Sequence, residues 1–191
     1  MYPIRVVTIS RQIGSMGFAI GKLVAQNKGW QFVCREAINQ AAIRAGTPQA
    51  ALAMIDEFNL FGFKLTPDEH QAYIQSIAKV MSELAEQGSI VILGRAGQVI
   101  LADRPDTLHV RIAAPAEIRA HRLAERHKIS LQAAKAQIAA SDKYRSTYLK
   151  RFYNVDWKDP NLYDLIINTA RITQTEAADL IQILIDRGKN G

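Results

Sequence analysis

The sequence predicts an α/β protein in which a parallel five-stranded sheet lies between two layers of helices. Two observations support this prediction. Five short apolar runs have the length and the β-branched content of strands, and they lie at about 4–9, 31–34, 89–93, 107–113 and 163–168. Helical periodicity separates these runs, and alternation of strands with helices is typical of a parallel sheet that is covered on both faces.

The composition indicates one domain with a preference for anionic ligands. The 191 residues, 48% of them hydrophobic, can bury one sizeable core, so we expect a single domain over residues 1–191. Lys and Arg number 24 against 18 Asp and Glu, which gives a net charge of +6. The arginines are spaced singly through helices, without the basic and aromatic run of a nucleic-acid binder. We therefore expect a small-molecule nucleotide as the partner.

Several features favour a cytoplasmic location. No run approaches the roughly 18 consecutive apolar residues that a membrane helix needs. The first residues enter a strand at once, which leaves no room for a signal peptide. Cys34 is the only cysteine, so no internal disulfide can form, and the four histidines are scattered. The sequence makes no prediction about the oligomeric state.

The first strand runs into a turn that contains two glycines, residues 10–18, and a helical pattern follows with Ile20, Leu23 and Val24 on one face. Backbone N–H groups of such a turn, together with the start of the helix, can bind a phosphate. The alternative is a tight strand–helix connection that needs small residues only. A dinucleotide-binding turn is disfavoured because G-x-G-x-x-G is absent.

This turn departs from the usual phosphate loop, G-x-x-x-x-G-K-[ST]. Aligning residues 14–18 with the end of that pattern places Gly17 at the lysine and Phe18 at the magnesium-binding hydroxyl. Arg11 is then the best candidate for the missing positive charge. Ser15 or Ser10 could supply the hydroxyl only if the loop is wound differently.

Residues 35–88 form a long helical excursion between the second and third strands. Pro48 and Gly62 punctuate it, and Thr66-Pro67 begins its best-marked helix, which Gly88 ends. An ordinary crossover needs only about a dozen residues, so we expect a small helical subdomain here. The alternative is helical decoration without a function.

Arginines recur at positions that could surround a phosphate. Arg95 follows the third strand, at the edge of a parallel sheet where ligands bind. Arg119 and Arg122 share one helix face, where the alternative is a solvated surface. Arg145 lies in the apolar stripe of the next helix, either paired with Asp142 or held over a cleft by it.

Taken together, these residues resemble the cytidylate kinase-like family of P-loop nucleoside monophosphate kinases. Five pieces occur in the family's order, and the resemblance runs from residue 4 to about 187. The pieces are residues 9–15, Gly94-Arg95 with residues 100–106, residues 114–122, the pair Asp142 and Arg145, and residues 163–169.

The resemblance implies a sheet of order 2-3-1-4-5, a monophosphate-binding insertion at 35–88 and a lid at about 115–152. It implies transfer of the γ-phosphoryl group of ATP, with Mg²⁺, to a nucleoside monophosphate, with CMP or dCMP first. The implied ATP-phosphate loop comprises Ser10, Arg11, Gln12, Gly14, Ser15, Met16, Gly17 and Phe18, with Ser15 as a possible metal ligand. The implied catalytic residues are Arg11, Arg119, Arg122 and Arg145, and the implied acceptor-binding residues are Arg95, Asp142, Arg145 and Arg35.

Three positions depart from the family's pattern. Ala96 and Cys34 stand where aspartates are common, and Ile138 stands where a further lid arginine is common. Together with the missing lysine, these departures leave a second hypothesis open. On that hypothesis the protein binds nucleotides with the same fold but has little or no catalytic activity.

Overall fold

The computed structural model describes residues 2–44 and 66–187. In this part of the chain the strands are β1 (Val6–Arg11), β2 (Gln31–Val33), β3 (Ile90–Leu93), β4 (Thr107–Ala113) and β5 (Leu165–Asn168). The helices are α1 (Gly17–Lys28), α2 (Arg35–Arg44), α4 (Pro67–Gln87), α5 (Gly97–Ile100), α6 (Ala116–His127), α7 (Leu131–Tyr153) and α8 (Gln174–Arg187). A short 3₁₀ helix, Pro160–Leu162, precedes β5.

The predicted α/β fold is confirmed, including the strand order β2-β3-β1-β4-β5 with every pair parallel. The central strand β1 extends two residues beyond its predicted end, because Ser10 pairs with Arg111 and Arg11 pairs with Ile112 of β4. Arg11 therefore ends a strand rather than lying in the loop. Its side chain therefore starts at the carboxyl end of the central strand, and ligands bind beyond the carboxyl ends of the strands in parallel sheets.

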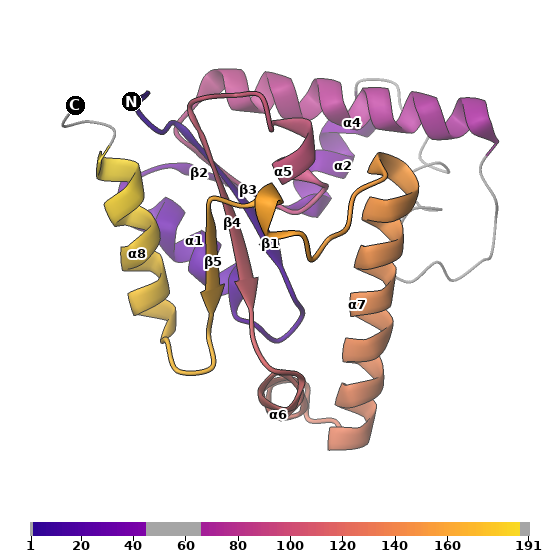
Figure 1. The fold of residues 1–191 in the computed structure, drawn as a ribbon, viewed down its shortest axis with the longest axis vertical. Coiled ribbons are helices and arrows are strands. Elements are labelled where there is room, and N and C mark those ends of the chain that lie inside the picture. The colour runs from indigo at the N-terminus through magenta and orange to yellow at the C-terminus, as the bar shows by residue number, and fades with distance from the viewer. Residues whose placement is uncertain (1, 45–65, 188–191) are drawn as a thin grey trace.

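Side chains alternate between the two faces of β1, and each face has its own core. Val7 and Ile9 pack in a cluster with residues of α1 and α8, whereas Val6 packs in a cluster with residues of α2 and α4. Figure 1 shows α1 and α8 on one side of the sheet and α4 with α2 on the other. Apolar side chains therefore pack on both faces of the central strand, as is typical of a parallel sheet, whereas Ile166 of the edge strand β5 is 46% exposed.

The helix signals in the sequence are confirmed where the structure describes them. Helix α4 begins at Pro67 and ends at Gln87, and Gly88 follows with φ +66°. Before α8, Thr173 Oγ1 accepts from the N–H of Glu176, and Glu176 Oε2 accepts from the N–H of Thr173. Pro48 and Gly62 lie outside the described residues. None of the described helices is long and apolar enough to cross a membrane.

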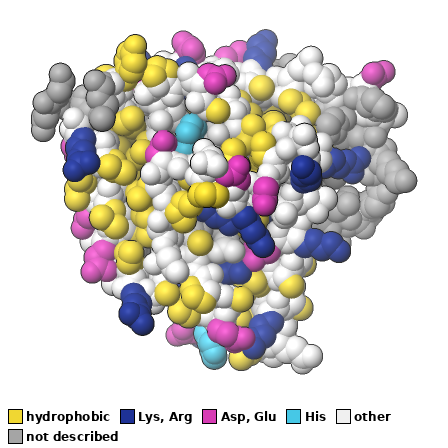
Figure 2. Space-filling view, in the orientation of Figure 1, with side chains coloured by type: hydrophobic (Ala, Val, Ile, Leu, Met, Phe, Trp, Pro, Cys, Tyr) yellow, Lys and Arg dark blue, Asp and Glu magenta, His cyan; other side chains and the backbone are white. Residues whose placement is uncertain are grey.

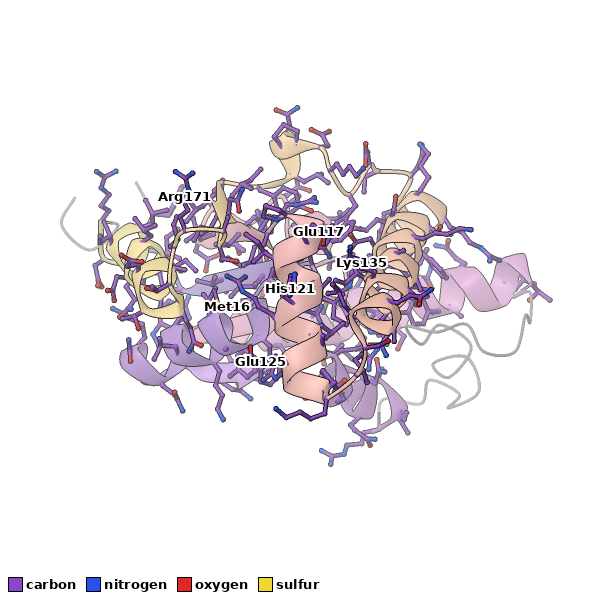
Figure 3. The ribbon with its side chains drawn as sticks, turned by 90° about the horizontal axis from the view of Figure 1, so that it is seen from below. Met16, Glu117, His121, Glu125, Lys135 and Arg171 are labelled. Atoms are coloured by element: carbon purple, nitrogen blue, oxygen red, sulfur yellow. The ribbon has the colours of Figure 1, made fainter. Side chains whose placement is uncertain are left out.

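Helix α6 lies below the sheet and is seen end-on in Figure 1, while α7 stands beside the sheet and crosses α6 at a steep angle. They pack through a small cluster that comprises Ala120, Leu123, Ala134 and Ile138. Ile138 is buried in this contact, so the position where a lid arginine was considered belongs to the core. An ion pair between Lys135 of α7 and Glu117 of α6 joins the two helices at 2.8 Å (Figure 3).

Candidate active site

The turn between β1 and α1 leaves the start of the helix open. Met16 is the N-cap residue in the left-handed region, with φ 67°, and no side chain caps the first N–H groups. Gly14, with φ +77°, packs on α6 so closely that a Cβ there would lie 2.7 Å from the carbonyl oxygen of Arg119. Figure 3 shows Met16 beside α6. Uncapped N–H groups and the helix dipole make this end of α1 suited to an anion.

A cavity of about 420 Å³ opens in front of this turn, and we call it the loop cavity. Among the residues that the structure describes, four arginines line it, Arg11, Arg122, Arg126 and Arg145, and no acidic side chain does. Its volume lies within the range of about 300–1,000 Å³ that is usual for small-molecule sites. The turn contributes Arg11, Gln12, Ile13, Gly14, Met16, Gly17 and Phe18 to its wall.

A second and smaller cavity, of about 50 Å³, lies at the carboxyl ends of β1 and β3, and we call it the Arg95 cavity. In the described part of the chain, its wall also carries four arginines and no acidic side chain. The arginines are Arg11, Arg35, Arg95 and Arg145, and Ser10, Gln98, Tyr144, Tyr148 and Trp157 are among the other lining residues. In Figure 2, Lys and Arg side chains gather near the centre of the face drawn.

Arg11 and Arg145 line both cavities. The side chain of Arg11 packs against two glycines, Gly17 near its Cβ and Gly94 near its guanidinium. A Cβ on Gly17 would lie 2.5 Å from Arg11 Cβ, and a Cβ on Gly94 would lie 2.5 Å from Arg11 Nη1. Arg145 Nη1 donates to the carbonyl oxygen of Arg11. Gly17 stands at the lysine position of a standard phosphate loop, and Arg11 fills the space that a side chain at Gly17 would need.

Arg95 is 7% exposed, and its partners are neutral. Its Nε and Nη2 donate to Asn39 Oδ1 at 3.1 and 2.8 Å, and Nη1 donates to Tyr73 Oη at 3.1 Å. Tyr73 Oη lies 3.2 Å from Tyr148 Oη. Burial raises the pKa of Tyr73 and that of Tyr148, so both phenols stay uncharged at neutral pH.

The structure does not bring Arg119 and Asp142 to either cavity. Arg119 is 3% exposed, and it makes a bidentate ion pair with Asp142 at 2.7 and 3.1 Å. It also donates to the carbonyl oxygens of Ala114 and Ile13. The alternative in which Asp142 pairs with Arg145 is wrong, because both carboxylate oxygens of Asp142 accept from Arg119 of α6. The Arg119–Asp142 pair thus holds the turn between β1 and α1 in place through the carbonyl oxygen of Ile13, without lining either cavity.

Arg122 lines the loop cavity and is held by Thr169, the residue that follows β5. Its Nη1 donates to Thr169 Oγ1 at 3.0 Å and its Nη2 donates to the carbonyl oxygen of Thr169 at 2.7 Å. Thr169 Oγ1 in turn lies 3.1 Å from the carbonyl oxygen of Ser15. Arg122 therefore has a defined position at the floor of the cavity.

The two serines considered as metal ligands are both engaged. Ser15 is fully buried, lines neither cavity, and donates its hydroxyl to the carbonyl oxygen of Gln12 at 2.8 Å. Ser10 Oγ accepts from Trp157 Nε1 at 2.9 Å. Within residues 2–44 and 66–187, no group of three or more His, Cys, Asp or Glu side chains could hold a metal ion.

Sequence reasoning missed several lining residues. Trp157 is 2% exposed, and its ring stacks 4.6 Å from the guanidinium carbon of Arg111. Gln98 is 3% exposed, and its Nε2 is buried without a hydrogen-bond partner among the described residues. The signal for Gln98 was its place five residues after the third strand ends at Leu93. Trp157 carried no local signal, because its contacts depend on tertiary packing.

The parallel sheet of order β2-β3-β1-β4-β5 is the fold of the P-loop kinase class. The two arginine-lined cavities at the carboxyl ends of its strands agree with that class. The chain belongs to the cytidylate kinase-like family, whose sequence model matches residues 6–171.

The chain is similar to several relatives that are named cytidylate kinase. The one from Methanocaldococcus jannaschii is 26% identical over 187 residues, which is 96% of this chain and 99% of the relative. The one from Pyrococcus horikoshii is 27% identical over 95% of this chain and 88% of the relative. The match to the Methanopyrus kandleri protein, at 34% identity, spans 54% of this chain and only 58% of the relative.

Solved structures show the same fold. An uncharacterized protein from Eubacterium ventriosum superposes with a TM-score of 0.76 at 22% identity, over 95% of this chain and 98% of that one. A gluconokinase from Sinorhizobium meliloti superposes with a TM-score of 0.57 at 14% identity, over 97% and 95%.

Proposed function

We propose that this protein transfers the γ-phosphoryl group of ATP to a nucleoside monophosphate, with CMP and dCMP as the leading acceptors. The observation that carries the proposal is the meeting of two arginine-lined cavities at Arg11 and Arg145. A phosphoryl group that passes from one ligand to the other needs positive charge at the point of transfer. The family and the names of the relatives support the same reaction.

The loop cavity is suited to the phosphates of ATP. The uncapped start of α1 offers N–H groups, and Arg122 and Arg126 add charge along the wall. Arg11 takes the role of the absent lysine, since its side chain covers the space above Gly17. Arg119 and Asp142 then act as positioning residues, because Arg119 holds the carbonyl oxygen of Ile13 in the turn.

The Arg95 cavity is suited to the phosphate of the acceptor. Its volume of about 50 Å³ matches a phosphate group rather than a whole nucleotide. Arg95, Arg35 and Arg145 surround that volume. We propose that the segment 35–88 binds the rest of the monophosphate and that residues 115–152 act as a lid. Closure of such a lid would exclude water from the transfer.

Mg²⁺ belongs to the proposal as a companion of ATP. The hydroxyl of Ser15 is turned away from the loop cavity, so the described residues are a poor fit for a direct ligand set. Mg²⁺ commonly keeps several waters and binds substrate phosphates, which suits a site of this kind. The residues of the chain supply arginines that neutralise charge on the transferring group.

A second candidate is a nucleotide-binding protein with weak catalysis. The glycine at the lysine position favours it, because the standard loop uses that lysine on the β- and γ-phosphates. The two candidates predict different behaviour toward ATP alone and toward ATP with an acceptor.

The deciding experiment mixes the protein with ATP, Mg²⁺ and each of several nucleoside monophosphates, and measures ADP. We expect acceptor-dependent ADP formation, with CMP or dCMP giving the highest kcat/KM. If ATP raises the melting temperature while no monophosphate increases ADP above the acceptor-free rate, the weakly catalytic candidate is correct. Protein with Arg11→Ala serves as the control for contaminating kinases.

A further inference from the structure

Arg95 is a buried cation whose partners carry no charge. Buried arginines usually pair with carboxylates, because an unpaired charge in a low-dielectric interior is costly. The two partners of Arg95 are an amide and a phenol, and the other charged groups on the wall of the Arg95 cavity are arginines. Among the described residues, the guanidinium thus has hydrogen-bond acceptors but no counter-ion.

The identity of the atoms in these contacts follows from the chemistry of arginine. A guanidinium only donates hydrogen bonds, so the atom of Asn39 that receives both Nε and Nη2 must be the carbonyl oxygen. Tyr73 Oη likewise accepts from Nη1, and it shares a second hydrogen bond with Tyr148 Oη, 3.2 Å away. These contacts set the plane of the guanidinium from three elements, α2, α4 and α7.

We propose that Asn39 and Tyr73 are positioning residues that orient Arg95 and, by being neutral, keep its charge available for the dianionic phosphate of the acceptor. An aspartate in place of Asn39 has nearly the same shape, but it would form a bidentate ion pair with Nε and Nη2. The carboxylate would then compete with the substrate phosphate for the same cation. The choice of an amide over a carboxylate is therefore a determinant of acceptor binding.

The rest of the cavity wall agrees with a ligand that only accepts hydrogen bonds. Gln98 lines the same wall, and its Nε2 is a buried donor without a partner among the described residues. A buried donor that lacks an acceptor costs free energy until a ligand supplies one. A phosphate offers acceptor oxygens to both groups. This inference rests on the assignment of the Arg95 cavity to the acceptor in the proposed function.

The test compares Asn39→Asp with Asn27→Asp, which makes the same charge change at an exposed position of α1. For Asn39→Asp we expect an unchanged or higher melting temperature, because Arg95 gains a counter-ion. We expect the KM for CMP to rise about tenfold or more while the KM for ATP stays within about twofold. A purely structural role for Asn39 would instead lower stability and change both KM values together.

Binding is measured separately from turnover, by calorimetry with CMP and with inorganic phosphate in the presence of saturating ADP. Arg95→Ala defines the part of the signal that belongs to this site. We expect Asn39→Asp to lose that part and Asn27→Asp to retain it. If transfer is never detected but binding follows this pattern, the proposed function fails and the inference stands.

Two results overturn the inference. One is wild-type affinity in Asn39→Asp, and the other is an equal response of the wild-type protein and Arg95→Ala to both probes.

If Asn39→Asp is less stable than the wild type, Tyr73→Phe decides, since it removes the acceptor of Nη1 without adding charge. We expect a several-fold higher KM for CMP at unchanged KM for ATP, and an unchanged acceptor KM in that variant overturns the inference as well.

Discussion

Arg11 owes its position to contacts with distant parts of the chain, which the standard phosphate-loop motif does not describe. It ends β1, and its guanidinium lies against Gly94 between the two cavities. Arg11→Ala should lower kcat/KM by about 10³-fold or more, because an arginine aimed at a transferring phosphoryl group contributes about 10³–10⁵ in rate. Arg11→Lys should recover only part of this loss, since a lysine lacks the planar fork. Steady-state kinetics test this, with exposed Arg171→Ala expected to match the wild type.

Gly94, which contacts the guanidinium of Arg11, gives a second prediction. Gly94 has φ +87°, and a Cβ there would lie 2.5 Å from Arg11 Nη1. Gly94→Ala should therefore displace the guanidinium and reduce kcat by about 100-fold, the scale of loss for a misplacement of about 1 Å. Gly29→Ala is the matched control, because Gly29 has φ +63° but open space around its Cβ. If both variants lose the same activity, backbone strain alone explains the loss.

At the scale of elements, the Arg119–Asp142 pair links α7 to α6 and α6 to the turn before α1. Asp142→Asn should destabilise the fold by about 1–3 kcal/mol, because the nearly buried Arg119 loses its counter-ion while Asp142 itself is 27% exposed. It should also raise the KM for ATP, since Arg119 holds the carbonyl oxygen of Ile13. Denaturant unfolding and kinetics measure the two effects.

The neighbouring ion pair provides the control for this prediction. Lys135 and Glu117 join the same two helices, but their side chains are 48% and 66% exposed. Glu117→Gln should change stability by less than about 1 kcal/mol and leave the KM for ATP unchanged. Equal effects of the two substitutions would mean that Arg119 has no special role in holding the turn.

The elements differ in how far the sequence predicted them. The existence and order of the strands, the start of α4 at Pro67 and the start of α8 after Thr173 follow from local chemistry. They were predicted correctly, although β1 ends two residues later than predicted. The partner of Asp142 was not, because Arg119 lies 23 residues away on another helix and the choice depends on how α6 and α7 pack. The position of the Arg11 guanidinium was not predicted for the same reason, because it depends on how closely Gly94, at the end of β3, lies to β1.

For the whole molecule, the two cavities should behave as one site with a shared centre. Arg126 lines only the loop cavity, Arg95 lines only the Arg95 cavity, and Arg145 lines both. Arg126→Ala should therefore raise the KM for ATP alone, and Arg95→Ala should raise the KM for the acceptor alone. Arg145→Ala should raise both and lower kcat further than either, because its charge acts where the phosphoryl group is transferred. If Arg145→Ala changes one KM only, the two cavities do not meet at this arginine, and transfer between them would need a different route.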